Sequence, residues 1–599
     1  MATTEQTTAL DRGPTARGLA LLKRGGTAAS GLASGNLPVL VLAWSAGGVI
    51  IFASLFTVWM TFVPRLPINP GFTFGNYTHV FDRYLLEVIP NTLLLGFGVV
   101  VFTVFWGVSL AWLLNRTNVP YRSLWITLLS VVLLVPGFLK AMGWILLLNP
   151  KIGVLNSAVA GVLGVDSVPM SVQNIWGIIF VMGLSLTPIV FFLVSGPIRS
   201  LDPALEEAAH VSGINTRKTI LRISLPMLWP AILGGAIYVF MTAVAIFEIP
   251  AVLGGLGRVS VLATELFYNV RPPEGAVSIP RYGVAGVYGM LIAVPSIVAL
   301  VFYLRMIDKS HRYAVIGGKG YRPRMIDLGR ARYLALAFVV LYLLLSAILP
   351  LAVLLWISLL PRLMLPSAEA FSLLTFDNFT NIGTIIGSTG IIWNTVMLTV
   401  AVPVLAMFFG LMMSWVVVRS RTRGHRLLDI VAMLPHAIPG LVFGFAFLML
   451  AIVMAKYLPW LPFFRTIGLV IVVIAVNRIS YSTRLTNAAL LQVGRELEES
   501  AHVSGTGTIA TLRLVLAPLI RTSLLFGLLW TALLAFREVS IPLLLAGPNN
   551  KVLAVVLWNE WQLGRLNGAS ALAVIMIVVM SAVILIFQRF GGLNQGRGA

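Results

Sequence analysis

Two nearly identical polar segments stand out from an otherwise apolar chain. Residues 205–213 read LEEAAHVSG and residues 497–505 read LEESAHVSG, a single difference in nine positions. In the first copy, Asp202 is a suitable cap for a helix that starts at Pro203, and Gly213 permits a left-handed exit from it. Paired glutamates suit the positive end of such a helix. The repeat therefore predicts two matched short helices that lie along the membrane surface and face the cytoplasm.

Ionisable residues at the ends of apolar runs form a second candidate set. Glu248 lies at the outer end of the apolar run 227–249. Arg537 and Glu538 lie at the equivalent end of the apolar run 519–543. Charged groups inside a membrane are costly and usually functional, which suggests a substrate path or a gate. Near the interface, however, such side chains also snorkel to water, and both interpretations stay open.

The sequence offers no residue set for catalysis or for a metal. It has no cysteine, which excludes disulfides and thiolate sites, and its six histidines form no H-x-x-x-H or H-x-E pair. The segment Gly317-Gly318-Lys319-Gly320 lacks the leading Gly and the Ser/Thr of a phosphate-binding loop. We expect no catalytic residue, no bound metal, no cofactor and no ATP site in this chain.

Composition excludes a soluble protein. Of 599 residues, 58% are hydrophobic and 11% are charged, whereas soluble domains carry about 25% charged residues. The net charge of +21 falls in short clusters between apolar runs, where charges that set topology belong, so nucleic acid is not an expected partner. We expect about twelve membrane spans, at residues 37–62, 90–114, 124–149, 173–195, 227–249, 283–305, 333–359, 391–418, 427–455, 467–487, 519–543 and 568–588.

The spans divide into two homologous halves of six helices. FTFGNYTHVF (72–81) corresponds to LTFDNFTNIG (374–383), and an Asn-Thr pair opens the second span of each half. An even number of spans gives parallel repeats related by an axis along the membrane normal. The predicted organisation is a disordered cytoplasmic tail (1–36), a first half (37–305), a basic linker (306–332), a second half (333–590) and a C-terminal tail (591–599).

Loop charges and prolines refine this arrangement. Lys and Arg are more frequent in one alternate set of loops than in the other, and the positive-inside rule then places both termini in the cytoplasm. The third spans are interrupted by Pro136-Gly137 in one half and by Pro435 with Pro439-Gly440 in the other, and kinks are expected there. The outer loop 251–282 is either a docking face for a partner or a solvated loop.

The repeated polar segment resembles the EAA loop of binding-protein-dependent ABC importer permeases. In that family, E-A-A is followed after three residues by Gly and, nine residues later, by I-x-L-P. The first half fits throughout, ending in Ile223-Ser224-Leu225-Pro226, and the resemblance extends over about residues 38–588. The second half departs from the pattern at Ser500, Val515 and Ala517.

This resemblance implies an all-α type I ABC importer permease with both membrane subunits fused in one chain of the bacterial inner membrane. Each loop would form a coupling helix that docks into one of two copies of a separate cytoplasmic ATPase, which binds the ATP. A periplasmic binding protein would deliver the substrate. The residues carried over to the ATPase contact are Glu207, Ala208, Ala209 and Gly213 in the first half, and Glu499, Ser500, Ala501 and Gly505 in the second.

The phrases VPGFLKAMGWILLL (135–148) and FREVSIPLLL (536–545) look most like the iron(III)-type permeases. Similar permeases carry thiamine, polyamines, phosphonates or sulfate-like anions, so these substrates stay open. An ion-coupled secondary transporter is the alternative class, but it would not require a matched polar loop in both halves. A membrane-embedded enzyme would need clustered His, Asp or Glu within the bilayer.

Overall fold

The structure is a computed structural model. It describes residues 36–64, 71–81, 85–150, 153–166, 168–257, 259–272, 279–310, 325–420, 422–460 and 463–590. The predicted terminal tails, apart from residue 36, lie outside these ranges. The middle of the predicted linker, including residues 317–320, also lies outside them.

The described chain is helical, with one isolated β-bridge between Thr117 and Ile326. Ten described helices are long and apolar enough to cross a membrane, or up to twelve if each of two bent pairs is one span, which agrees with the predicted number. About 20 apolar residues suffice for a crossing, and a helix satisfies its own backbone in lipid. The long helices are α2 (Leu37–Met60), α4 (Leu85–Arg116), α8 (Ile175–Arg199), α11 (Leu225–Ala245), α14 (Tyr282–Ser310), α15 (Arg332–Leu343) with α16 (Leu349–Ser358), α20 (Thr389–Val418), α22 (Gly440–Tyr457), α23 (Ile467–Leu491) and α30 (Leu566–Phe590).

The bent pairs and a third break occur where the sequence interrupts its apolar runs. Helices α5 (Arg122–Leu134) and α6 (Gly137–Leu147) meet at 94°. The segment Thr508–Leu519 meets α27 (Arg521–Phe536) at 85°. In the second half, α21 (His425–Ala437) ends just before Pro439. Proline lacks the N–H that a continuous helix needs, so the predicted interruptions at Pro136-Gly137 and Pro439-Gly440 are confirmed, whereas Pro435 lies inside α21 and does not end it.

Shorter helices connect these elements. The ones used below are α9 (Pro203–Val211), α12 (Glu248–Gly257), α13 (Leu262–Val270), α24 (Arg495–Val503), α28 (Ser540–Leu545) and α29 (Leu553–Gln562). The others are α3 (Gly75–Phe81), α7 (Val154–Leu163), α10 (Thr216–Thr219), α17 (Ala368–Ser372), α18 (Asp377–Thr380), α19 (Ile382–Ile386), α25 (Thr508–Thr511) and α26 (Ala517–Leu519). Single π-helical turns occupy Ile220–Ser224, Leu344–Ile348 and Leu512–Leu516.

Contacts group the chain into two units, which we describe separately. The first unit comprises Met1–Ile51, Val404–Met433 and Arg478–Leu528, and the second comprises Phe52–Pro403, Leu434–Asn477 and Leu529–Ala599. These units cut across the two sequence halves.

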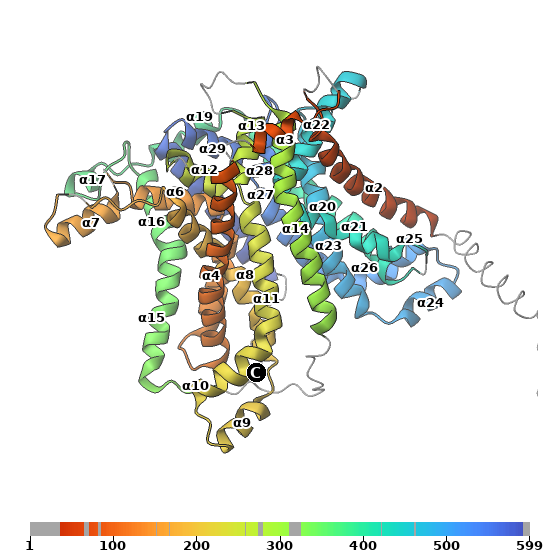
Figure 1. Cartoon of the computed structure of the whole chain (residues 1–599), viewed down its shortest axis with the longest axis horizontal. Helices are drawn as coiled ribbons and strands as arrows, with labels where there is room; N and C mark the ends of the chain where they lie inside the picture. Colours follow the sequence, from red (N-terminus) through yellow and green to blue (C-terminus); the bar gives the residue numbers. More distant parts are fainter. Residues whose placement is uncertain are drawn as a thin grey trace, which may run out of the picture. The chain divides into compact units, whose positions relative to one another are not determined.

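In the second unit, α4, α8 and α11 pack side by side, with α9 at one end of this bundle and α13 at the other (Figure 1). Glycines permit the close approach of α4 and α8. A Cβ on Gly107 of α4 would lie 2.7 Å from the Cβ of Val190 in α8. Small residues at such contacts are typical of membrane helices, because they let backbones approach closely.

The first unit repeats this contact with its own residues. Gly410 of α20 occupies the position equivalent to Gly107, and a Cβ there would lie 2.6 Å from the Cβ of Ser482 in α23. Beside it, the Ser414 hydroxyl donates to the Thr483 carbonyl (2.9 Å). Helix–helix packing is therefore conserved between the second and fourth spans of both halves, despite different side chains.

The first span of each half packs against the other half. In the second unit, Tyr342 of α15 donates its hydroxyl to the Leu184 carbonyl of α8 (2.8 Å), and the rings of Phe338 and Trp106 stack with centroids 4.3 Å apart. In the first unit, Gly47 of α2 lies against Leu428 of α21. This exchange explains why contacts do not separate the chain at the boundary between the sequence halves.

Candidate functional site

The two polar loops form the matched short helices that the sequence predicts. The Asp202 carboxylate accepts a hydrogen bond from the Ala204 N–H (2.9 Å) at the start of α9. Each helix is followed, two residues after its end, by a glycine with a left-handed backbone, Gly213 at φ 78° and Gly505 at φ 81°. Left-handed glycines commonly close helices in this way, so the predicted start and end of the first loop are confirmed.

The predicted coupling residues divide into exposed and inward-facing positions. Glu207, Ala208 and Gly213 are exposed in the first loop, as are their counterparts Glu499, Ser500 and Gly505 in the second. Ala209 is buried, and Ala501 is half-buried. Each helix therefore presents its second glutamate and the following small residue away from the chain.

The first glutamate of each pair, which is not among the predicted coupling residues, points inward. Glu206 forms an ion pair with Arg116 at the end of α4, and both side chains are buried. Glu498 forms the equivalent pair with Arg419, directly after α20, at 3.5 Å. From the sequence alone, Arg116 and Arg419 are loop charges that the positive-inside rule already accounts for. The signal that could have found the pairs is the recurrence of Arg four residues after a Trp in both halves, at Trp112 and Trp415.

The second hydrogen bond to each buried glutamate differs between the halves. In the first half, the Ser224 hydroxyl donates to Glu206 Oε1 (2.8 Å). In the second, Leu516 replaces this serine, and Trp415 Nε1 donates to Glu498 Oε1 (2.6 Å) instead. The variable position of I-x-L-P thus differs between the halves together with the hydrogen-bond donor, while the ion pair is kept.

The predicted path residues gather at breaks between helices in the second unit. Glu248 begins α12 and accepts a hydrogen bond from the Ser540 hydroxyl (3.0 Å), which begins α28. These residues occupy equivalent positions, because Glu248-Ile249-Pro250 corresponds to 540–542. Arg537 and Glu538 lie between α27 and α28 and interact electrostatically with Glu248.

Two cations bind the carbonyls at the end of α5. Arg537 Nη1 donates to the carbonyls of Leu133 (2.8 Å) and Leu134 (3.3 Å). Lys140 Nζ donates to the carbonyl of Val132 (3.0 Å) and is 1% exposed. A broken helix leaves its last carbonyls without helical partners, and cations stabilise this negative end. Lys140 was missed, although it is the only charge in the predicted span 124–149.

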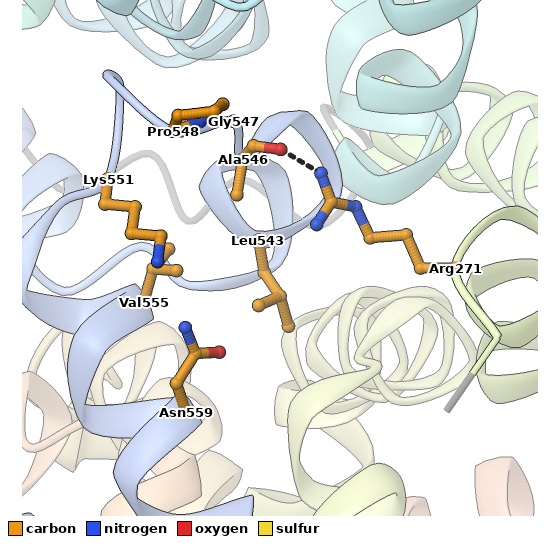
Figure 2. Close-up of a pocket in the computed structure, with 8 residues that line it drawn as sticks. All are labelled: Arg271, Leu543, Ala546, Gly547, Pro548, Lys551, Val555 and Asn559. Atoms are coloured by element: carbon orange, nitrogen blue, oxygen red, sulfur yellow. Dashed lines mark hydrogen bonds between the residues drawn. The ribbon is translucent and has the colours of Figure 1, made fainter. Parts of the chain in front are cut away.

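A pocket of about 380 Å³ lies next to the α28–α29 connection in the second unit. Arg271, which follows α13, donates through Nε to the Leu544 carbonyl (3.1 Å) and also binds the Ala546 carbonyl. Figure 2 shows Lys551 and Asn559 across the pocket from this arginine. The basic lining belongs in part to the predicted outer loop 251–282, of which residues 258 and 273–278 are not described. Burial raises the pKa of Glu265 in the same loop.

Comparison with known proteins supplies the family. Residues 103–355 and 406–593 match the family described as binding-protein-dependent transport system inner membrane component. The ferric transport system permease protein FbpB of Actinobacillus pleuropneumoniae is 26% identical over 555 residues, which cover 90% of this chain and 75% of that protein.

Two further similarities cover smaller parts of the chain. The spermidine/putrescine transport system permease protein PotB of Escherichia coli (strain K12) is 27% identical over 215 residues, or 35% of this chain and 76% of that protein. A solved bacterial ABC transporter involved in the import of the acidic polysaccharide alginate aligns with a TM-score of 0.34 and 22% identity, over 43% of this chain and 88% of that one. Because the two family matches together cover most of the sequence, the protein belongs to the binding-protein-dependent transport system inner membrane components, as a chain that carries two permease halves.

Proposed function

We propose that this ABC importer permease moves ferric iron across the bacterial inner membrane, with both termini in the cytoplasm. A periplasmic binding protein would deliver the iron, and ATP would be hydrolysed on two copies of a separate ATPase subunit. The observation that carries the ATPase assignment is the matched pair of short helices, each of which exposes a glutamate, Glu207 or Glu499. The substrate assignment draws on similarity to the ferric permease over 90% of the chain.

Co-purification tests the ATPase contact. The full chain is expressed with candidate ABC ATPases of the same genome and purified in detergent, alone and with Gly213→Ala or Gly505→Ala. An alanine at these left-handed positions costs roughly 1–2 kcal/mol and should weaken ATPase association and transport. Gly161→Ala is the control, because a Cβ there meets no atom within 4 Å. If no ATPase binds, and both variants transport like the parent, the assignment is wrong.

Titration of the partner binding protein tests the substrate. Ferric ion, thiamine, spermidine and a phosphonate are added separately, and binding is measured by calorimetry. Ferric ion should bind most tightly. Polyamine is the second candidate, because the polyamine permease matches 35% of this chain, and tighter binding of spermidine than of ferric ion would replace the iron assignment.

We further propose that Glu248, Arg537 and Glu538 face the transport path, together with Lys140. Their support is that they gather where α5, α12 and α28 begin or end, and a path needs polar groups at membrane depth. Glu248→Gln should reduce iron transport by proteoliposomes at least tenfold. Glu369→Gln is the matched control, because Glu369 forms an exposed pair with Arg362 (3.5 Å). If Glu248→Gln transports iron like the parent, the assignment of Glu248 to the path is wrong.

A further inference from the structure

The short helices α9 and α24 have almost no apolar attachment to the rest of the chain. Glu498 is the one buried side chain of α24, whose other side chains are exposed or half-buried. In α9, Glu206 and Ala209 are the buried ones among the side chains that the structure describes. Surface helices are normally held by an apolar stripe, so these two helices depend on a different attachment.

That attachment is an ion pair built in the same way in both halves. Arg116 and Arg419 occupy equivalent positions at the end of the second span, and their side chains are 0% and 6% exposed. Their partners Glu206 and Glu498 are 8% and 9% exposed. The two pairs lie in different units of the structure, so each is an independent observation of the same arrangement.

The free-energy cost of burying these pairs indicates that they do more than stabilise the fold. Burial of two charges costs several kcal/mol per ion in lost hydration, and well-packed apolar residues of similar volume often stabilise a protein as well or better. A buried charge is nevertheless stable only beside its partner, and loss of one partner leaves an uncompensated charge, so each pair fixes one element relative to another. Retention of the pair in both loops, while Ser224 and its counterpart Leu516 diverged, suggests a requirement for this fixed geometry.

We propose that Glu206 and Glu498 are positioning residues that tie each coupling helix to the second span of its half. Glu207 and Glu499, one residue later, then remain free of the membrane part and available to the ATPase. Movement of α9 is transmitted through Arg116 to α4, which packs closely along α8 at Gly107. In the second half, Arg495 reinforces the link, because it donates to the Val418 carbonyl at the end of α20 (3.2 Å). This inference rests on the proposed function for its coupling role, but the mechanical link is testable without an ATPase.

The cysteine-free sequence permits spin labels at chosen sites of the full chain. Labels at Leu124→Cys and Ser212→Cys report the position of the first coupling helix, and labels at Leu427→Cys and Ser504→Cys report the second. All four sites are exposed. Pulsed electron paramagnetic resonance in nanodiscs gives each distance distribution, with Glu206→Gln or Glu498→Gln added.

We expect Glu206→Gln to broaden the 124–212 distribution at least twofold and to leave the 427–504 distribution unchanged, with the reverse result for Glu498→Gln. Glu207→Gln should leave both distributions as in the parent, because its side chain faces away from the chain. Glu369→Gln serves as a control for charge removal in an exposed ion pair. Parental distributions in both Glu206→Gln and Glu498→Gln would overturn the proposal.

A neutral double variant separates the loss of the ion pair from misfolding caused by an unpaired buried charge. Arg116→Met with Glu206→Met removes both charges and leaves no unpaired buried ion, so it should elute as a monodisperse protein even if Glu206→Gln does not. It should still broaden the 124–212 distribution and reduce transport at least tenfold while the ATPase co-purifies. A double variant that keeps the narrow distribution and parental transport would overturn the proposal. If the distance distributions broaden as expected but no ATPase co-purifies with the chain, the proposed function is wrong and the link between the helices still stands.

Discussion

Trp112 and Trp415 occupy equivalent positions in the two halves but make different contacts. Trp415 Nε1 donates to Glu498 Oε1 (2.6 Å), whereas the ring of Trp112 lies 5.8 Å from the guanidinium carbon of Arg116. The contribution of each tryptophan should therefore differ, although a sequence comparison treats the two as the same residue.

Phenylalanine at each position separates these roles. Trp415→Phe removes a hydrogen bond to a charged group, worth about 1.5–3 kcal/mol, and should lower the unfolding temperature clearly. Trp112→Phe keeps an aromatic face for Arg116 and should cost no more than about 0.5–1 kcal/mol. Thermal unfolding of the full chain in detergent measures both. Equal shifts would show that the Trp415 hydrogen bond contributes little.

Arg537 provides a second prediction for a single residue. Arg537→Met leaves the Leu133 and Leu134 carbonyls without this donor, and a buried unsatisfied group costs about 1–3 kcal/mol. Arg362→Met is the control, because an exposed ion pair contributes about 0–1 kcal/mol. The measurement is again the unfolding temperature, and an equal effect of the two substitutions would contradict the prediction.

The packing of α4 against α8 makes a prediction at the scale of helices. Gly107→Ala places a methyl group 2.7 Å from the Cβ of Val190 and 3.1 Å from the backbone nitrogen of Phe191, so overpacking should cost about 1–3 kcal/mol. Gly48→Ala in α2 is the matched control, because a Cβ there meets nothing within 4 Å. It should be neutral or stabilise α2 by up to about 1 kcal/mol. An equal change in stability in both variants would contradict the prediction that packing at Gly107 is specific.

Sequence patterns predicted the elements better than their orientation. Proline and glycine specify local backbone geometry, so the break at Pro136 and the end of α9 shortly before Gly213 followed from residue type alone. The sequence could not tell which glutamate of each adjacent pair is buried. Neighbouring positions on a helix point about 100° apart, and the choice depends on where the arginine of a distant helix lies.

The path residues illustrate the same limit. Glu248, Arg537 and Glu538 were found because charges near spans are unusual. Their actual partners, the Ser540 hydroxyl and the carbonyls at the end of α5, are close only after both halves have folded. No local pattern contains that information.

At the scale of the whole molecule, the exchange of first spans predicts that the covalent linker is dispensable for assembly. Fragments 1–317 and 318–599 are co-expressed, with an affinity tag on the first. The second fragment should co-purify, because α15 and α16 contact α4, α6 and α8. Omission of residues 329–358 from the second fragment is the control and should greatly reduce recovery. Recovery that does not depend on these residues would show that the exchanged helices are unnecessary for association.

The exchange also has a consequence for biogenesis. When synthesis has reached Ser310, at the end of α14, the residues that later cover part of α4 and α8 have not been made. Among them are Phe338 and Tyr342. Roughly 50 further residues must be made before α16 is complete, which takes several seconds at about 5–20 residues per second. During that interval, lipid or the insertion machinery must cover this surface of α4 and α8. The packing of the first half is therefore complete only after the first span of the second half has been inserted.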